Sequence, residues 1–190
     1  MMMHAIDLAP HCNAHAATFD GGRSLGCVNI WGNSFPAEEV PFGRTMIVGG
    51  VSYRLAAKLP GAPDHVEALG QRIEVGAVAG GQALGVLGFG ELGSQDLTLA
   101  LTDCFGVVVR IQVTMPNWLL PREVPASAAA WSASHLHYVG DYELDHLRPA
   151  MFSVMARLPT LAWLVAVTIE PNPLAHVMGL TFLREGGLHA

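Results

Sequence analysis

The sequence predicts an all-β protein, an antiparallel β-sandwich of the jelly-roll type that occupies residues 1–190 as a single domain. Three observations lead to this prediction. About nine short segments alternate apolar and polar residues or are rich in β-branched residues. Turn-forming residues separate these segments at intervals of roughly 8–15 residues, as in sandwiches. A chain of 190 residues is long enough to bury a two-layer core by itself.

The first part of the chain combines loops with an early hairpin. Residues 4–35 hold Gly and Asn residues between short apolar pieces, which is typical of turns. Residues 46–48 and 51–55 are strand-like and are separated by Gly49-Gly50, so we expect them to pair.

The middle of the chain predicts the centre of the sandwich. Residues 71–75 alternate, and residues 83–89 form an apolar run interrupted by glycines, which indicates a central strand covered on both faces. Residues 97–102 and 106–113 read as a hairpin whose turn is Asp103–Gly106.

The last third supplies the remaining strands. Residues 127–134 are alanine-rich and predict an irregular or single-turn helical connector, followed by an extended strand around His135. Strands are then expected over 151–157, 164–169 and 175–183, with Trp163 in the core.

The composition and charge of the chain limit the kinds of partner that we expect. A net charge of -6, with ten Lys and Arg residues spread singly, leaves no basic stripe for nucleic acid. No apolar run is long enough to span a bilayer, and the N-terminus lacks a basic segment followed by an apolar one, so we expect a cytoplasmic protein without a membrane partner. The apolar composition, 51% hydrophobic and 14% charged, is compatible with a homodimer.

Cys12, Cys27 and Cys104 are expected to be reduced and mostly buried thiols.

Several short motifs occur in a recurring order along the chain, at residues 19–22, 32–39, 63–66, 70–73, 84–89, 117–118 and 172–177. Together they resemble a galactose-binding-like β-sandwich family, the carbohydrate-binding-module-like domains associated with bacterial glycoside hydrolases. The resemblance supports the jelly-roll fold and implies a non-catalytic carbohydrate-binding module as one function.

The densest chemistry lies in residues 134–148. In an extended strand His135 and His137 project to the same side, so the two imidazoles form one face, whereas Ser134 points away from His135. With Glu143, this resembles the His-x-His…Glu metal site of cupins, which are themselves jelly rolls. A divalent metal held by His135, His137, Glu143 and His176 is therefore one hypothesis.

The same segment also suits an enzyme without a cofactor. A neutral imidazole of His135 or His137, oriented by Asp141 or Glu143, can transfer protons near neutral pH. Tyr138 or Tyr142 can donate to a developing oxyanion. The opposing interpretation is that the two histidines are satisfied structural residues at a sandwich edge.

Further groups predict ligand contacts. Trp31, Asn33, Trp131 and Tyr142 are the candidate ligand-binding residues, since Trp31 and Trp131 fall in loop-like surroundings where they can stack on a planar ligand. The acidic and amide residues of the opening suit a structural calcium site or, alternatively, ordinary turns. These residues are Asp20, Asn29, Asn33, Glu38 and Glu39.

The sequence leads to one preferred function and two alternatives. We expect a small-molecule-binding sandwich that acts as a cofactor-independent acid/base enzyme, a cyclase, lyase or isomerase, on a small, largely apolar biosynthetic intermediate. The alternatives are the carbohydrate-binding module and the cupin-like metal-dependent enzyme.

Overall fold

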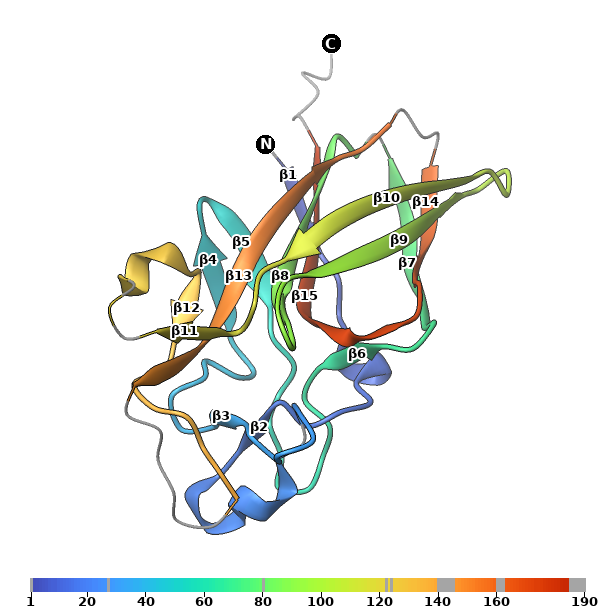
Figure 1. The fold of residues 1–190 in the computed structure, drawn as a ribbon. Coiled ribbons are helices and arrows are strands. Elements are labelled where there is room, and N and C mark those ends of the chain that lie inside the picture. Colours follow the sequence, from blue (N-terminus) through green and yellow to red (C-terminus); the bar gives the residue numbers. More distant parts are fainter. Residues whose placement is uncertain are drawn as a thin grey trace.

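The computed structural model describes residues 2–26, 28–79, 81–121, 123, 125–139, 146–159 and 163–184. Two sheets face each other and form a β-sandwich, with a loop-rich end below them (Figure 1). The predicted antiparallel β-sandwich is confirmed. No helix in the described part of the chain has the length and apolar character required to cross a bilayer.

The larger sheet has seven strands in the order β1-β15-β8-β13-β11, with β12 added to β13 and β6 added to β15. Its pairings are antiparallel, and β8 lies between the two longest strands. The strands are β1 (Met2–Ala5), β6 (Val66–Ala68), β8 (Ala83–Gly90), β11 (Leu119–Pro121), β12 (Trp131–Ser132), β13 (Leu147–Arg157) and β15 (Asn172–Arg184).

The smaller sheet has four strands in the order β10-β9-β14-β7. The β9–β10 hairpin extends away from the body of the molecule, as Figure 1 shows. The strands are β7 (Arg72–Ala79), β9 (Gln95–Asp103), β10 (Val108–Met115) and β14 (Trp163–Ile169).

Short elements complete the structure around these sheets. Strands β2 (Ala17–Thr18) and β3 (Phe35–Pro36) pair in parallel, and β4 (Thr45–Val48) pairs with β5 (Val51–Arg54). Three 3₁₀ helices are η1 (Ala9–His11), η2 (Asp20–Leu25) and η3 (Ala126–Ala128). Strands β2 and β3 and helix η2 form the lower end in Figure 1.

The main core fills the space between the two sheets. Alternation places Leu97, Leu99 and Leu101 of β9 against Leu180 and Phe182 of β15, and all five are buried. Burying a large aliphatic or aromatic side chain stabilises the fold by about 1.5–3 kcal/mol, so this apolar layer holds the sandwich together.

A second core covers the opposite face of the larger sheet. Leu87 and Phe89 of β8 pack there with Phe35, Tyr53 and Trp118. Strand β8 is therefore covered on both sides, as its apolar run predicts. Because this second core includes β3 and the residues around it, it supports the loop-rich end of the molecule.

The glycines of β8 permit two close approaches. A Cβ at Gly85 would lie 2.6 Å from the Tyr53 hydroxyl, and a Cβ at Gly88 would lie 2.1 Å from the carbonyl oxygen of His176. Strand β15 changes register with β8 between Val177 and Gly179, beside this contact. The glycines thus let β15 and the Tyr53 ring pack directly on the central strand.

The predicted hairpins and the central strand are confirmed, whereas three local predictions are wrong. The segment around His135 is a bend followed by a single bridge between His137 and Ser34, not a strand. Trp163 begins β14 and is 49% exposed, so it lies outside the core. Cys104 is exposed in the β9–β10 turn and is free, as is Cys12.

Candidate functional site

His137 connects three segments that are far apart in the sequence. Its main chain exchanges two hydrogen bonds with Ser34, which follows the loop before β3. Its Nδ1 lies 3.0 Å from the hydroxyl of Thr18 in β2, and that hydroxyl lies 2.7 Å from the Ser34 hydroxyl. All three residues are buried, so the parallel β2–β3 pair fixes the His137 ring in one orientation.

His135 lies beside this ring and is held by a carboxylate. The centroids of the two imidazoles are 5.1 Å apart. Nδ1 of His135 lies 3.2 Å from Oε1 of Glu39 and 2.8 Å from the Ser134 hydroxyl, which itself donates to Glu39. The close Ser134–His135 contact contradicts the expectation that they point apart, because the segment bends and neighbouring side chains need not alternate.

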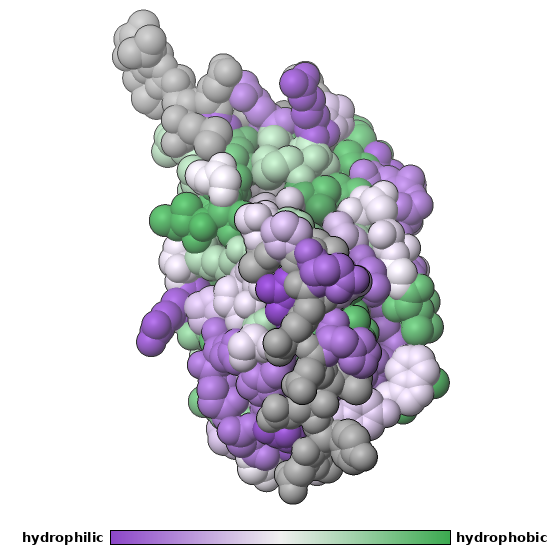
Figure 2. Space-filling view, turned by 60° about the vertical axis from the view of Figure 1, so that its left-hand side comes forward, coloured by the Kyte–Doolittle hydropathy of each residue, from purple (hydrophilic) through white to green (hydrophobic). Residues whose placement is uncertain are grey.

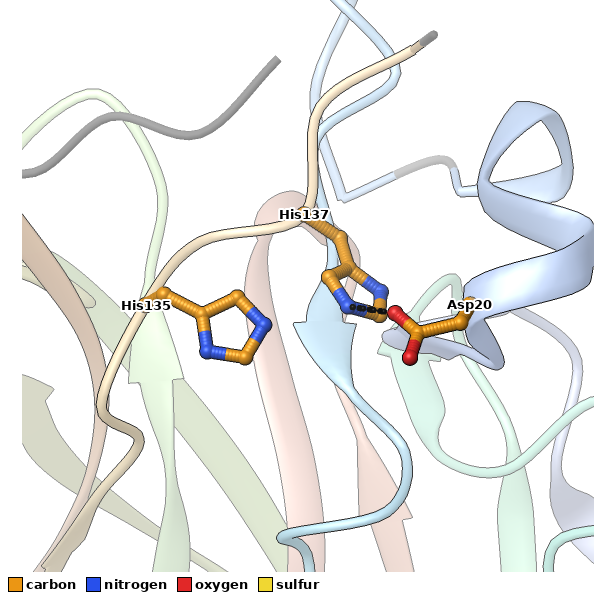
Figure 3. A group of neighbouring side chains, drawn as sticks. All are labelled: Asp20, His135 and His137. Carbon is orange, nitrogen blue, oxygen red and sulfur yellow. Dashed lines mark ion pairs between the residues drawn. The ribbon is translucent and has the colours of Figure 1, made fainter. Parts of the chain in front are cut away.

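Asp20 completes the group from the first residue of η2. Its Oδ1 lies 3.2 Å from Nε2 of His137, and Figure 3 shows the carboxylate and both imidazole rings turned toward a common space. Arg23 donates a hydrogen bond of 2.8 Å to the same oxygen. This hydrogen bond from Arg23 lowers the pKa of Asp20, so the carboxylate is ionised at neutral pH.

The protonation of His137 follows from its surroundings. Burial, together with the positive charge of Arg23, lowers the pKa of His137, so the ring is neutral at physiological pH. Nε2 approaches Asp20 but has no hydrogen-bond partner among the described residues. The Thr18 hydroxyl can donate to Nδ1 or accept from it, so this contact is compatible with either tautomer of His137. In the tautomer with Nδ1–H, Nε2 carries a lone pair directed at the shared space.

The group can therefore do two kinds of chemistry. The ligand atoms of Asp20, His135 and His137 all lie within 4.8 Å of one another, which is compact enough for one metal ion. Glu39 contacts Nδ1 of His135 and Thr18 contacts Nδ1 of His137, which leaves Nε2 of each ring for the ion. Metal-bound histidines usually have such a partner at the second ring nitrogen. A carboxylate behind an imidazole also prepares that imidazole to act as a general base.

The other predicted catalytic residues are only partly described. Tyr138 directly follows His137 and is half-buried. Asp141, Tyr142 and Glu143 lie outside the described residues. The structure therefore brings together His135 and His137 of the predicted set and adds Asp20, Glu39 and Thr18 to them.

The predicted ligand-binding residues differ in their accessibility. Trp31 is 50% exposed in a turn, as a stacking residue requires. Trp131 lies in β12 and packs beside Phe35 at a centroid distance of 5.9 Å, so it contributes to the second core. Asn33 is buried, and its Oδ1 has no hydrogen-bond partner among the described residues.

His176 does not join the predicted metal site. It lies in β15, where its Nδ1 is 2.9 Å from Nε2 of His65, and the described metal-ligand group contains Asp20 instead. The physical reason is the position of β15 within the larger sheet, which places His176 against Phe89 and His65.

The candidate calcium ligands mostly organise local backbone. Asn29 accepts hydrogen bonds from the main chain of Trp31 and Asn33, and Glu38 accepts one from Asp20. Glu39 accepts the main-chain N–H of Ser134. These contacts correspond to the alternative interpretation of the segment as turns.

A hollow of about 380 Å³ adjoins the same segment. It is lined by Thr18, Phe19, Gly21 and Leu25, among others, so it borders the residues on both sides of Asp20. The imidazoles of His135 and His137 do not line the hollow. Thr18 does line it, and the Thr18 hydroxyl contacts His137. The visible surface of this end of the molecule is mostly hydrophilic (Figure 2).

Sequence reasoning missed the partners that orient the rings. The sequence predicts Glu39 and Asp20 only as calcium ligands and indicates no role for Thr18. A faint signal exists in the spacing of Thr18 and Asp20, which places two polar side chains one residue apart beside an apolar Phe19. The contacts of Thr18 with His137 and of Glu39 with Ser134 join residues more than 90 positions apart, and no local sequence pattern indicates them.

Comparison with known protein families identifies the family of the chain. Residues 2–185 match the model of a family described as the AziU2-like beta-sandwich domain. No curated protein matches the chain.

Proposed function

The chain belongs to the AziU2-like β-sandwich family, and from this premise we propose that it serves a biosynthetic pathway as an acid/base enzyme. The proposed substrate is a small, largely apolar intermediate, and the proposed reaction is a cyclisation, elimination or isomerisation that needs no cofactor. These reactions share one requirement, a group that removes a proton from the substrate and can return it.

The contact between Glu39 and His135 carries this proposal. Nδ1–H of His135 is directed at Oε1 of Glu39 and at the Ser134 hydroxyl, which leaves the lone pair on Nε2. The negative Glu39 stabilises the imidazolium that forms when Nε2 accepts a proton. His135 is partly exposed, with 25% of its side chain accessible, so a substrate can reach it. We assign it as the general base.

Asp20 and His137 have complementary roles in this proposal. The ionised carboxylate of Asp20 favours positive charge on the substrate or on His135 as the reaction proceeds. The buried His137 is neutral and is oriented by its contact with Thr18, and we propose that in its Nδ1–H tautomer it acts as an acceptor beside the reacting atoms. Tyr138, Asp141 and Glu143 remain proposed orienting residues, and Tyr142 a proposed ligand contact.

The apolar hollow beside η2 supports the choice of substrate class. Phe19 and Leu25 contribute hydrocarbon to its lining, and Thr18 lies between the hollow and His137. A volume of about 380 Å³ is at the small end of the range for metabolite pockets. We propose that the apolar part of the substrate occupies this hollow.

The test uses the metabolite that accumulates when the gene is deleted. Purified protein is incubated with that metabolite, and the product is followed by mass spectrometry in the presence of a chelator. We expect turnover by the unmodified protein and a loss of about 100-fold or more in His135→Asn. Unchanged turnover in His135→Asn would reject His135 as the base, and a requirement for added metal would reject the cofactor-free reaction.

A divalent-metal enzyme is the second candidate, favoured by the unpartnered Nε2 of His137. A buried ring nitrogen without a hydrogen-bond partner is costly unless an ion or ligand satisfies it. Asp20, His135 and His137 offer one oxygen and two nitrogens, a set that suits Zn²⁺ and related ions. Co²⁺ titration followed by visible absorption tests this, with loss of the signal expected in His137→Gln.

A carbohydrate-binding role has weaker support. Of the two candidate stacking residues, Trp31 presents half of its surface, whereas Trp131 packs in the second core. Of this predicted pair, therefore, only Trp31 is accessible enough to stack on a glycan.

A further inference from the structure

Lys58 is the only lysine in the chain, since every other residue among the ten Lys and Arg is an arginine. Its side chain is only 5% exposed, and Nζ lies 2.6 Å from Oδ2 of Asp64, whose side chain is fully buried. A buried ion pair adds little to stability, because removing both charges from water costs about as much as their attraction returns. Stability alone therefore gives little reason to bury this one lysine.

The carboxylate that holds Lys58 is itself anchored. Asp64 accepts hydrogen bonds from the main-chain N–H groups of Ala16 and Ala17, and it lies 3.0 Å from Nδ1 of His65. These contacts attach the carboxylate to strand β2, which begins at Ala17. The position of Nζ relative to β2 is therefore fixed.

The ammonium group of Lys58 joins two segments that line the hollow of about 380 Å³ beside η2. Asp64 connects it to β2, and Nζ also donates to the main-chain carbonyl of Ala62 at 3.1 Å, in the turn at residues 59–62. Lys58 is itself a lining residue, so its ammonium group lies at the wall of the hollow. The other lining residues of the two segments are Ala17 and Thr18 of β2 and Pro60 and Gly61 of the turn.

One N–H group of Lys58 remains for a ligand. An ammonium group has three N–H donors in a tetrahedral arrangement. Within the described residues, the hydrogen bonds of Nζ go to Asp64 and to Ala62, so the third N–H points away from both. A buried donor without an acceptor is costly, and a ligand in the hollow would remove this cost.

We propose that the substrate carries a carbonyl group whose oxygen accepts the third N–H of Lys58. Phe19 and Leu25 line the same hollow and offer hydrocarbon for the rest of the molecule. This inference rests on the proposed function, because it assigns a polar group to the substrate whose apolar part occupies the hollow.

The charges around the hollow favour an uncharged carbonyl over a carboxylate. The positive charge of Lys58 is already compensated by Asp64, so an anion finds no net positive charge there. Asp20, which directly precedes the lining residue Gly21, is ionised and repels an anion. A ketone, ester or amide accepts the N–H without adding a charge. We therefore expect one of these groups in the substrate.

The test uses the single lysine as a probe. Protein containing lysine labelled with ¹⁵N at Nζ is titrated with cyclohexanone, and the one labelled resonance needs no assignment. We expect a saturable shift of this resonance. Methylenecyclohexane, which has the same shape without the oxygen, and cyclohexanecarboxylate, which has the charge, should bind about tenfold or more weakly than the ketone.

A double variant removes the donor without leaving a buried charge unpaired. Lys58→Met combined with Asp64→Asn should weaken binding of cyclohexanone about tenfold or more, measured from the carbonyl resonance of the ¹³C-labelled ketone. Binding of methylenecyclohexane should not change, which is the control for an intact hollow. Should this variant fold poorly, the three ligands still decide the question in the unmodified protein.

The outcomes separate this inference from the acid/base proposal. His135→Asn should lose turnover but keep the Nζ shift, so a failed turnover assay leaves the contact with Lys58 in place. No saturable shift, or equal binding of methylenecyclohexane, would overturn the contact. Equal or tighter binding of cyclohexanecarboxylate would overturn the choice of an uncharged carbonyl, and unchanged ketone binding in the double variant would overturn the role of Lys58.

Discussion

The Thr18 hydroxyl lies 3.0 Å from Nδ1 of His137, and this contact joins residues 119 positions apart in the sequence. It holds the orientation of a fully buried imidazole. The ring could otherwise turn, so the geometry of the whole candidate site depends on this hydroxyl. Four variants test this and related structural relationships.

Thr18→Val should destabilise the protein. Valine has nearly the same shape but removes the partner of Nδ1 of His137 and of the Ser34 hydroxyl, both buried. Leaving a buried polar group unsatisfied costs about 1–3 kcal/mol. Urea unfolding should show this loss, whereas Thr45→Val, at an exposed position on β4, should be near neutral. Equal stability of the two variants would mean that the Thr18 hydroxyl does not hold the ring.

Glu39→Gln should reduce turnover without reducing stability appreciably. The amide keeps the shape of the side chain but loses the negative charge that stabilises the His135 imidazolium. We expect kcat to fall by about 10-fold to 100-fold with little change in KM. Because the Glu39–His135 pair is partly exposed, the melting temperature should move by no more than a few degrees.

Glu74→Gln is the matched control for this prediction, since it removes an exposed carboxylate on the smaller sheet. Its kcat should equal that of the unmodified protein. A Glu39→Gln variant with full kcat would show that the carboxylate only supports the Ser134 bend.

The stability of the protein should fall as the pH is lowered from neutral, and His176 should be a main cause. Its folded-state pKa is lowered to about 3 by burial, whereas an unfolded histidine titrates at about 6.5. Between these values the unfolded chain binds more protons, so the free energy of unfolding falls with decreasing pH. One such group contributes about 1.4 kcal/mol per pH unit in this window.

Urea unfolding between pH 7 and pH 4 measures this slope. His137, whose pKa is also lowered, contributes in the same direction. His176→Gln should be less stable at neutral pH but should show a shallower slope. A slope identical to that of the unmodified protein would mean that His176 is protonated in the folded state.

Gly88→Ala should destabilise the protein strongly, although it adds only one methyl group. The added Cβ would lie 2.1 Å from the carbonyl oxygen of His176, a backbone atom that cannot turn away. Overpacking of this kind costs about 1–3 kcal/mol or more, because β8 and β15 would have to separate. Differential scanning calorimetry should show a clear loss in melting temperature.

Gly21→Ala is the control for this variant. A Cβ at Gly21 would meet nothing within 4 Å, so the melting temperature should stay the same or rise slightly. If both variants behave alike, the close approach of β15 to β8 is not a constraint on the fold.

Much of the sandwich could be predicted because its signals are local. Alternating residues over 97–102 and 106–113 with a turn at Asp103 specify a hairpin, and the structure contains it as β9 and β10. The apolar run at 83–89 specifies a strand covered on both faces, and β8 is such a strand. Periodicity fails where the chain bends, and the His135 segment was therefore wrongly predicted as a strand.

In the candidate site, too, some features follow from the sequence and others only from the tertiary structure. The sequence by itself determined that two imidazoles, separated by one residue, are available for proton transfer or metal binding. Only the tertiary structure decided that Asp20, Glu39 and Thr18 surround them, and that His176 pairs with His65 instead. The physical reason is that a side chain's neighbours across a sandwich are set by strand pairing and core packing, and residues far apart in sequence leave no local pattern of that contact.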